Sequence, residues 1–234
     1  MKLSQILLFL FSFFSVLSIL GVIIENENLF LISKTIIFPC ILFYYFDKMN
    51  KINYLFLIIL LIFYLVDIIL ILDIPNQIFY FTVLLNINHL IILGYSIKNI
   101  EKRQIEYKLL FFSIFMFLLG CSIQYLIYDL IKQQNFSAAI AIFLSGIFVS
   151  IFNGISLYNY LVRNSFICYY FGFACLSLGL MYACYDIYKY VYYIKILRIL
   201  SLFFKIAAYF LFIKFILAKE TYLLKKENNL QEII

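Results

Sequence analysis

Tryptophan is absent from this chain of 234 residues, and glycine, proline and charged residues are scarce. Seven glycines and two prolines leave few breaks in regular structure, which favours long uninterrupted helices. Only 13% of the residues are charged, whereas a soluble domain averages about 25%. A water-facing globule of this size needs more polar surface than the chain supplies. The composition therefore excludes an ordinary soluble protein.

The chain also lacks the side chains on which most metal and disulfide sites depend. Its one histidine, His89, excludes zinc sites built from several imidazoles. The cysteines are odd in number and all fall inside apolar runs, which is typical of small buried side chains and not of a disulfide framework. They are Cys40, Cys121, Cys168, Cys175 and Cys184. We expect neither a bound metal nor a cofactor.

What remains is apolar: hydrophobic residues make up 66% of the chain, and the mean hydropathy is +1.05. A membrane-spanning helix needs about 20 consecutive, mainly apolar residues. Runs near this length lie at about 5–24, 28–46, 54–72, 77–97, 108–130, 136–159, 165–188 and 194–217. The sequence therefore predicts an all-α polytopic membrane protein, with eight transmembrane helices in one bundle that forms a single domain over 1–234. The first run follows Lys2, but no small-residue cleavage site follows it, so we interpret it as a helix and not as a signal peptide.

Basic residues predict the orientation of the helices. The N-terminus, alternate loops and the tail hold Lys2, Lys48, Lys51, Lys98, Lys102, Arg103, Lys108, Arg163, Lys219, Lys225 and Lys226. The opposite loops hold Glu25, Glu27 and Asp73, with Lys132, Lys189, Lys195 and Arg198 as exceptions. The positive-inside rule therefore places both termini in the cytoplasm, and the net charge of +6 gives no reason to expect a nucleic-acid partner. The Ile-, Lys- and Asn-rich composition is typical of an AT-rich bacterial genome, and it therefore favours a bacterial cytoplasmic (inner) membrane.

Ionisable side chains inside the apolar runs are the candidate functional residues. Each costs about 2.5–3.5 kcal/mol at the centre of a helix, so each needs a reason. They are Lys34, Asp67, His89, Asp129, Asp186 and Lys205. The predicted orientation places Lys34 and the three aspartates in the non-cytoplasmic half, with His89 and Lys205 near the middle. Structural explanations compete: ion pairing for Lys34, snorkelling or pairing for Lys205, and an interfacial place for Asp129.

Tyrosines accompany two of the acids at helical spacing. Tyr64 precedes Asp67 by three residues and Tyr182 precedes Asp186 by four, so each phenol shares a helix face with its acid. Polar faces of membrane helices point toward the bundle interior, because lipid leaves them without partners. We therefore predict a site formed by Lys34, Asp67, His89 and Asp186, lined by Tyr64 and Tyr182.

The order of these features resembles the YhhN family of bacterial lysoplasmalogenase-like membrane proteins over nearly the whole chain. The matching segments are Ser33-Lys34-Thr35, Val66-Asp67-Ile68, Asn88-His89-Leu90 and Tyr185-Asp186-Ile187. The neighbours of the charged residues differ from the family pattern. Relatives usually have Pro where this chain has Thr35, Gly where it has Val66, and Ser where it has Tyr185.

The resemblance implies a membrane hydrolase that cleaves the vinyl-ether bond of lysoplasmalogen-type lysolipids by carboxylate acid/base catalysis. Asp67 is then the general acid and Asp186 the base, or the reverse. Lys34 contacts the phosphate or holds an aspartate ionised, and His89 orients water or shares a proton. Substrate and surrounding membrane lipid are the implied partners.

A non-enzymatic role is the alternative, because paired charges inside a membrane also serve ion and proton pathways. The chain is then a lipid or metabolite carrier, or a scaffold. No pair of helices broken by Gly or Pro marks a transporter site, which favours the enzyme.

Overall fold

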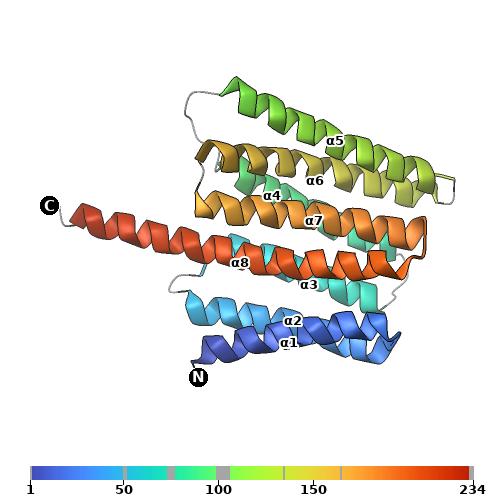
Figure 1. The fold of residues 1–234 in the computed structure, drawn as a ribbon, viewed down its shortest axis with the longest axis horizontal. Coiled ribbons are helices and arrows are strands. Elements are labelled where there is room, and N and C mark those ends of the chain that lie inside the picture. Colours follow the sequence, from blue (N-terminus) through green and yellow to red (C-terminus); the bar gives the residue numbers. More distant parts are fainter. Residues whose placement is uncertain are drawn as a thin grey trace.

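The computed structural model describes residues 2–49, 52–72, 77–98, 106–133, 135–163 and 165–231. Within these ranges it contains eight helices and no strand, which confirms the predicted all-α fold. The helices are α1 (Leu3–Ile23), α2 (Glu27–Lys48), α3 (Tyr54–Leu72), α4 (Gln77–Lys98), α5 (Tyr107–Ile131), α6 (Phe136–Arg163), α7 (Phe166–Tyr190) and α8 (Lys195–Gln231). They pack side by side in one bundle (Figure 1).

The observed helix ends lie within about four residues of the predicted ones, with one exception. Helix α8 continues well past residue 217, where the apolar run ends, and reaches Gln231. The segment AKETYLLKKENNLQ that follows the run contains neither Gly nor Pro and is rich in good helix formers. Hydropathy therefore located the membrane-spanning part of α8, while helix propensity sets its end.

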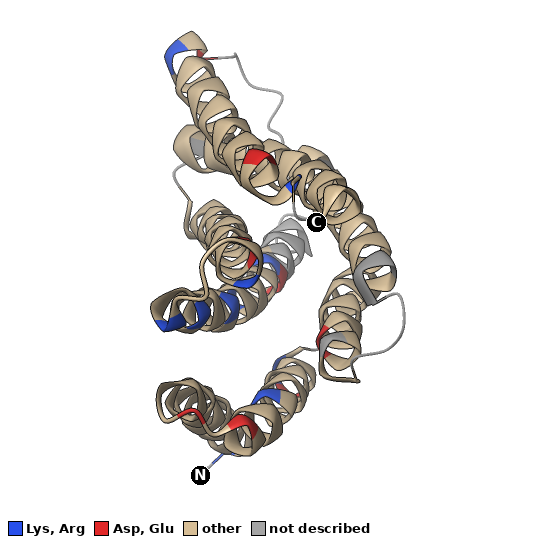
Figure 2. Cartoon of the chain, turned by 90° about the vertical axis from the view of Figure 1, so that its right-hand side faces the viewer, with Lys and Arg blue, Asp and Glu red and all other residues tan. Residues whose placement is uncertain are grey.

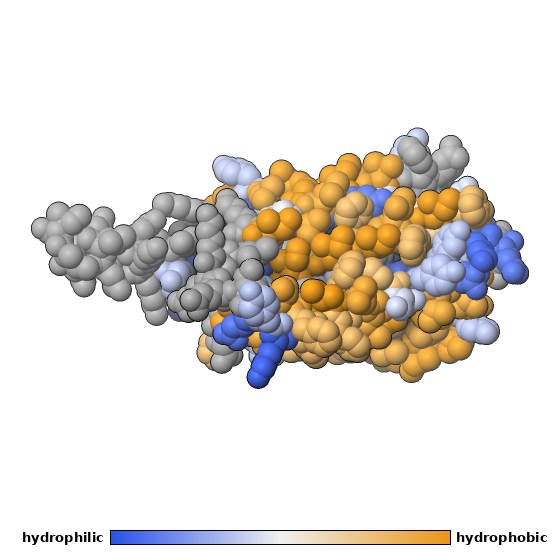
Figure 3. Space-filling model, turned by 90° about the horizontal axis from the view of Figure 1, so that it is seen from above, coloured by the Kyte–Doolittle hydropathy of each residue, from blue (hydrophilic) through white to orange (hydrophobic). Residues whose placement is uncertain are grey.

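Seven of the described helices are long and apolar enough to cross a membrane, and α3 is a shorter apolar helix. Nineteen residues of α3 span about 28 Å at 1.5 Å per residue, close to the ~30 Å of a hydrocarbon core. The face shown in Figure 3 has a broad apolar belt with hydrophilic residues toward its two ends. Seen along the helices, charged residues occupy only a few positions (Figure 2). These features are those of a multi-pass membrane protein.

Consecutive helices run antiparallel, and both termini lie at the same end of the bundle (Figure 1). The tightest pairs are α1 with α2, α5 with α6, and α7 with α8, and α8 also packs on α1 and α2. The side of the membrane on which the termini lie stays a prediction. Of the residues that carried it, Lys51, Asp73, Lys102 and Arg103 lie outside the described ranges.

A tight turn joins α1 to α2 at the end of the bundle opposite the termini. Glu25 has φ 60°, the left-handed conformation, and the Asn26 side chain accepts a hydrogen bond from the Leu29 amide to cap α2. Gly21 permits the close crossing of the two helices, because a Cβ there would lie 2.7 Å from the Phe30 nitrogen. This turn fixes the first residues of α2, which border the site described next.

Candidate functional site

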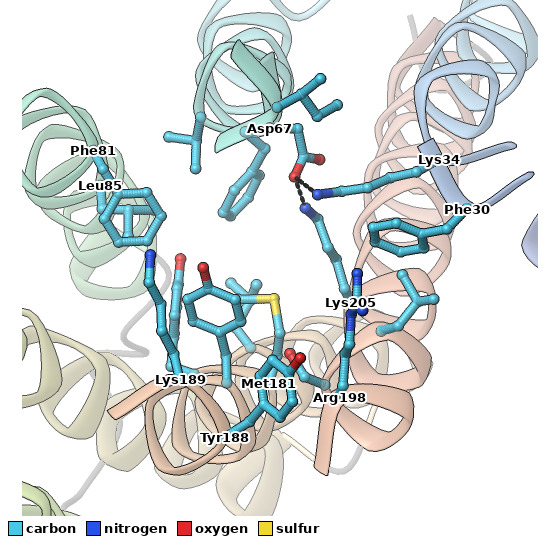
Figure 4. A pocket seen from close by; sticks show the side chains of 18 of the residues that line it. Phe30, Lys34, Asp67, Phe81, Leu85, Met181, Tyr188, Lys189, Arg198 and Lys205 are labelled. Atoms are coloured by element: carbon cyan, nitrogen blue, oxygen red, sulfur yellow. Dashed lines mark hydrogen bonds and ion pairs between the residues drawn. The ribbon is translucent and has the colours of Figure 1, made fainter. Parts of the chain in front are cut away.

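A cavity of about 420 Å³ lies inside the bundle, between α2, α3 and α4 on one side and α7 and α8 on the other. Its walls are largely apolar and include Phe63, Val66, Phe81, Leu85, Leu178 and Met181. Polar side chains enter from α2, α3, α7 and α8 (Figure 4). A volume of this size is typical of small-molecule sites, which range over about 300–1,000 Å³.

Asp67 forms the polar centre of this cavity. It is only 6% exposed, and its Oδ1 atom lies 3.2 Å from Lys34 Nζ and also accepts a hydrogen bond from Lys205 Nζ (Figure 4). The Tyr209 hydroxyl donates to Oδ2 at 3.3 Å. Lys205 and Tyr209 are four residues apart on α8, so they share the helix face that meets α3. The acid inside the apolar run of α3 is therefore held by cations from two other helices.

Two further ion pairs join the α1–α2 turn to the start of α8. Arg198 donates from both terminal nitrogens to Glu27, at 2.7 and 3.0 Å, and its guanidinium lies 4.5 Å from the centre of the Phe30 ring. Lys195 donates to Glu25 at 2.9 Å, and this hydrogen bond and charge lower the pKa of Glu25. The basic residues that broke the predicted charge pattern, Lys195 and Arg198, thus have acidic partners at the same end.

Asp186 does not line the main cavity, although its depth resembles that of Asp67. It is 7% exposed and lies at a second cavity of about 20 Å³, with room for about one water molecule, together with Gln124, Ser145 and Tyr182. Among the described residues its carboxylate has no hydrogen bond and no ion pair. Tyr182 lines both cavities, so this phenol separates the two acids. The structure therefore brings Lys34, Asp67 and Tyr182 to one cavity and places Asp186 behind Tyr182.

His89 is fully buried and lies next to Tyr182, not at the main cavity. The two rings meet edge to face with centroids 5.1 Å apart, and Phe152 packs at 5.7 Å. Neither ring nitrogen has a hydrogen-bond partner in the part of the chain that the structure describes. Tyr64 also misses the cavity, because it stacks on Phe38 with centroids 4.5 Å apart. Both residues are therefore neighbours of the site and do not line it.

Several cavity residues were not predicted as part of the site. They include Glu27, Lys189, Arg198 and Tyr209, as well as Lys205, a candidate residue that the predicted site left out. On α8 a signal existed: Arg198, Lys205 and Tyr209 are separated by seven and four residues, so they follow one face of the helix. Across the described ranges, His, Cys, Asp and Glu side chains form no group of three or more suited to a metal ion.

Comparison with known proteins does not identify a family. No protein-family model matches the chain, and no curated protein or solved structure matches it either. The resemblance to the YhhN family therefore depends on the residues quoted above and stays a hypothesis.

Proposed function

We propose that this chain is a membrane-embedded hydrolase of the lysoplasmalogenase type, which binds a single-chain lipid in the main cavity and cleaves its vinyl-ether bond. The observation that carries the proposal is the buried Asp67 carboxylate with its two lysines, which faces an apolar cavity. Apolar walls suit a hydrocarbon chain, and ammonium groups suit the phosphate of a lysolipid head group. Both kinds of group lie within one cavity, as an amphipathic substrate requires.

The reaction needs a proton donor and an anion. A proton is added to the β-carbon of the O–CH=CH unit, which leaves a positive charge shared by the α-carbon and the ether oxygen. The oxygen of water then bonds to the α-carbon and returns one proton. The resulting hemiacetal breaks its carbon–oxygen bond to give a fatty aldehyde and a glycerophospho-alcohol. Water is consumed, and the protein regains its starting state once the proton taken from water has passed back to the acid that donated the first proton.

The two acids have unequal surroundings, which suits this division of labour. Asp67 contacts two ammonium groups, which favour its anionic form, so we assign it the role of accepting a proton from water. Asp186 has no cation in ion-pair contact among the described residues, so it is the better proton store. Tyr182 borders both cavities, and in the proposed mechanism its hydroxyl, which has no partner among the described residues, bonds to Asp186 during proton transfer to the substrate. The geometry thus favours Asp186 over Asp67 as the acid, which reverses our first assignment.

Aldehyde release by the purified protein tests the proposal. The test variant carries both Asp67→Asn and Lys205→Met, and its control carries Lys205→Met alone. Asp67→Asn by itself would leave two lysines without a counter-charge, and Lys205→Met removes one of them. We expect the double variant to lose a factor of about 10²–10⁴ in turnover relative to its control, as for loss of a catalytic acid or base. Asp186→Asn should lose a comparable factor. Full turnover in both variants contradicts catalysis by these carboxylates.

A carrier or binding protein is the second candidate, and the separation of Asp186 from the main cavity favours it. A lipid that binds in the cavity without ever releasing aldehyde would support this role. Measurement of binding and turnover on the same sample separates the two candidates.

For the membrane, we propose the bacterial inner membrane, with both termini in the cytoplasm and the main cavity toward the outer half. The basic residues of alternate loops support this orientation. Reporters fused to the C-terminus should be active when they require the cytoplasm and inactive when they require the periplasm. The opposite pattern would reverse the orientation.

A further inference from the structure

We propose that the main cavity selects single-chain lipids whose head group is an anionic phosphate without an amine, and that it rejects phosphocholine and phosphoethanolamine heads. This inference rests on the proposed function in one respect only, namely that the ligand is a single-chain phospholipid. It concerns the binding of the head group and does not require hydrolysis.

Basic side chains outnumber acidic ones in the cavity wall. Four basic side chains line it, namely Lys34, Lys189, Arg198 and Lys205. The acidic side chains among its described lining residues are Glu27 and Asp67. Lys189 also interacts with Asp186, and even without Lys189 one positive charge remains in excess. An anionic head group compensates this excess, whereas a zwitterionic head leaves it unchanged. In a site that is partly closed off from water, this difference is large.

Both carboxylates of the cavity wall already have cationic partners. Glu27 accepts from both terminal nitrogens of Arg198, and Asp67 contacts Lys34 and Lys205. The ammonium of an ethanolamine head needs a carboxylate or several other acceptors. It would have to displace a cation of the protein from either acid, at a place where cations are already in excess.

The protein's own cations cover several aromatic faces of the cavity wall. A quaternary ammonium is recognised by aromatic rings that surround it within about 6 Å. Arg198 lies 4.5 Å from the Phe30 ring centre and 6.0 Å from that of Tyr188. Lys189 lies 5.8 Å from Tyr185, and Lys205 lies 5.7 Å from Tyr209. These rings are therefore poor partners for choline, because a second cation would meet the first.

The arrangement of the cations suits a phosphate. Arg198, Lys189 and Lys205 reach the cavity from α7 and α8, while Lys34 reaches it from α2 beside Asp67 (Figure 4). A lysine ammonium has three donors, so Lys205 can keep its bond to Asp67 and still donate to a phosphate oxygen. The guanidinium of Arg198 has five donors, and Glu27 occupies only two of its nitrogens. The same cations can thus hold the structure and bind an anion.

Binding of four lysolipids with one shared acyl chain tests the selectivity. They are lysophosphatidic acid, lysophosphatidylglycerol, lysophosphatidylethanolamine and lysophosphatidylcholine, added to the purified full chain in a neutral detergent. Their acyl ester replaces the vinyl ether, so the measurement is independent of turnover and distinguishes failed selectivity from failed hydrolysis. We expect the two amine-free lipids to bind at least 10-fold more tightly. Equal affinity for lysophosphatidylcholine, or binding of none of the four, would overturn the proposal.

Variants locate the effect in the cavity. Arg198→Gln should weaken lysophosphatidic acid binding about 10-fold or more, and Arg198→Lys, which keeps the charge but not the fork, should weaken it less. Glu27→Gln should strengthen binding several-fold, because it releases the Arg198 guanidinium. The matched control is Lys214→Gln, which removes a charge from α8 at a residue that does not line the cavity and should change nothing. Equal effects of Arg198→Gln and Lys214→Gln would show that the attraction is not specific to the cavity.

Discussion

Replacing Asp67 with asparagine should destabilise the protein strongly, although the two side chains have nearly the same shape. Asp67 is the acid that Lys34 and Lys205 both contact, and the three side chains are at most 15% exposed. The neutral amide leaves two ammonium groups close together without a counter-charge. Removal of one partner from a buried ion pair costs about 3–5 kcal/mol. We expect about 3 kcal/mol, the lower end, because both lysines border the cavity.

Lys205→Met should behave differently, because Asp67 keeps Lys34 as its partner. Replacement of a buried charge by an apolar side chain of similar length is often neutral, so we expect a change within about 1 kcal/mol. Combining Lys205→Met with Asp67→Asn should recover at least about 1 kcal/mol of the loss caused by Asp67→Asn alone. This non-additivity is the mark of a direct interaction between the two residues.

Thermal unfolding in detergent can be followed with a thiol-reactive fluorescent dye. Cys40, Cys168 and Cys175 are free and buried, so they react only when the bundle opens. For a chain of this size about 1 kcal/mol shifts Tm by roughly 2–4 °C, so Asp67→Asn should lower Tm by roughly 6–12 °C. If Asp67→Asn is as stable as the wild type, or if the two substitutions are additive, the ion-paired arrangement of Asp67 is wrong.

Three further outcomes are expected. Gly21→Ala should cost about 1–3 kcal/mol by forcing α1 away from the Phe30 backbone, measured as a lower Tm. Glu25→Gln should remove a small stabilisation that the ion pair with Lys195 provides. Because the pKa of Glu25 is lowered in the fold, this stabilisation is present above the usual glutamate pKa of 4.5 and is lost as the pH falls below that value. High salt should also remove it. Tyr182→Phe should leave Tm unchanged or raise it, since the buried hydroxyl has no partner among the described residues, yet it should reduce aldehyde release. A loss of both stability and activity would make Tyr182 structural.

The fold was largely predictable because a membrane imposes a length on each helix. Runs of about 20 apolar residues and short polar breaks gave the eight helices, and tight breaks made neighbours antiparallel. The pairing of Lys34 with Asp67 was also within reach, since their depths in the membrane could be compared. The end of α8 could not be predicted in this way, because hydropathy does not distinguish helix from loop once the chain leaves the apolar region.

The partners across helices were harder to predict, because depth is only one of the coordinates that decide a contact. Lys205 contacts Asp67 because α8 returns to pack on α1 and α2, a closure that the order of the chain does not reveal. The rotation of each helix about its own axis is equally important, because it decides which side chains face the cavity. Lys205, which was left out of the predicted site because snorkelling or structural pairing could explain it, contacts Asp67 directly, as Lys34 does.

Asp67 and Asp186 show how rotation separates residues of the same type at similar depth. On α7, Leu178, Tyr182 and Tyr185 face the main cavity, whereas Asp186, one residue further, turns by about 100° toward Gln124. Asp67 thereby contacts two cations, while Asp186 borders a small cavity with Gln124, Ser145 and Tyr182 and has no ion pair among the described residues. A vinyl-ether hydrolase needs one carboxyl group that stays anionic and another that carries a proton, and different surroundings are the way in which proteins provide them. In the proposed mechanism, the place of Asp186 behind Tyr182 provides this difference in surroundings, and Tyr182 passes the proton from Asp186 to the substrate.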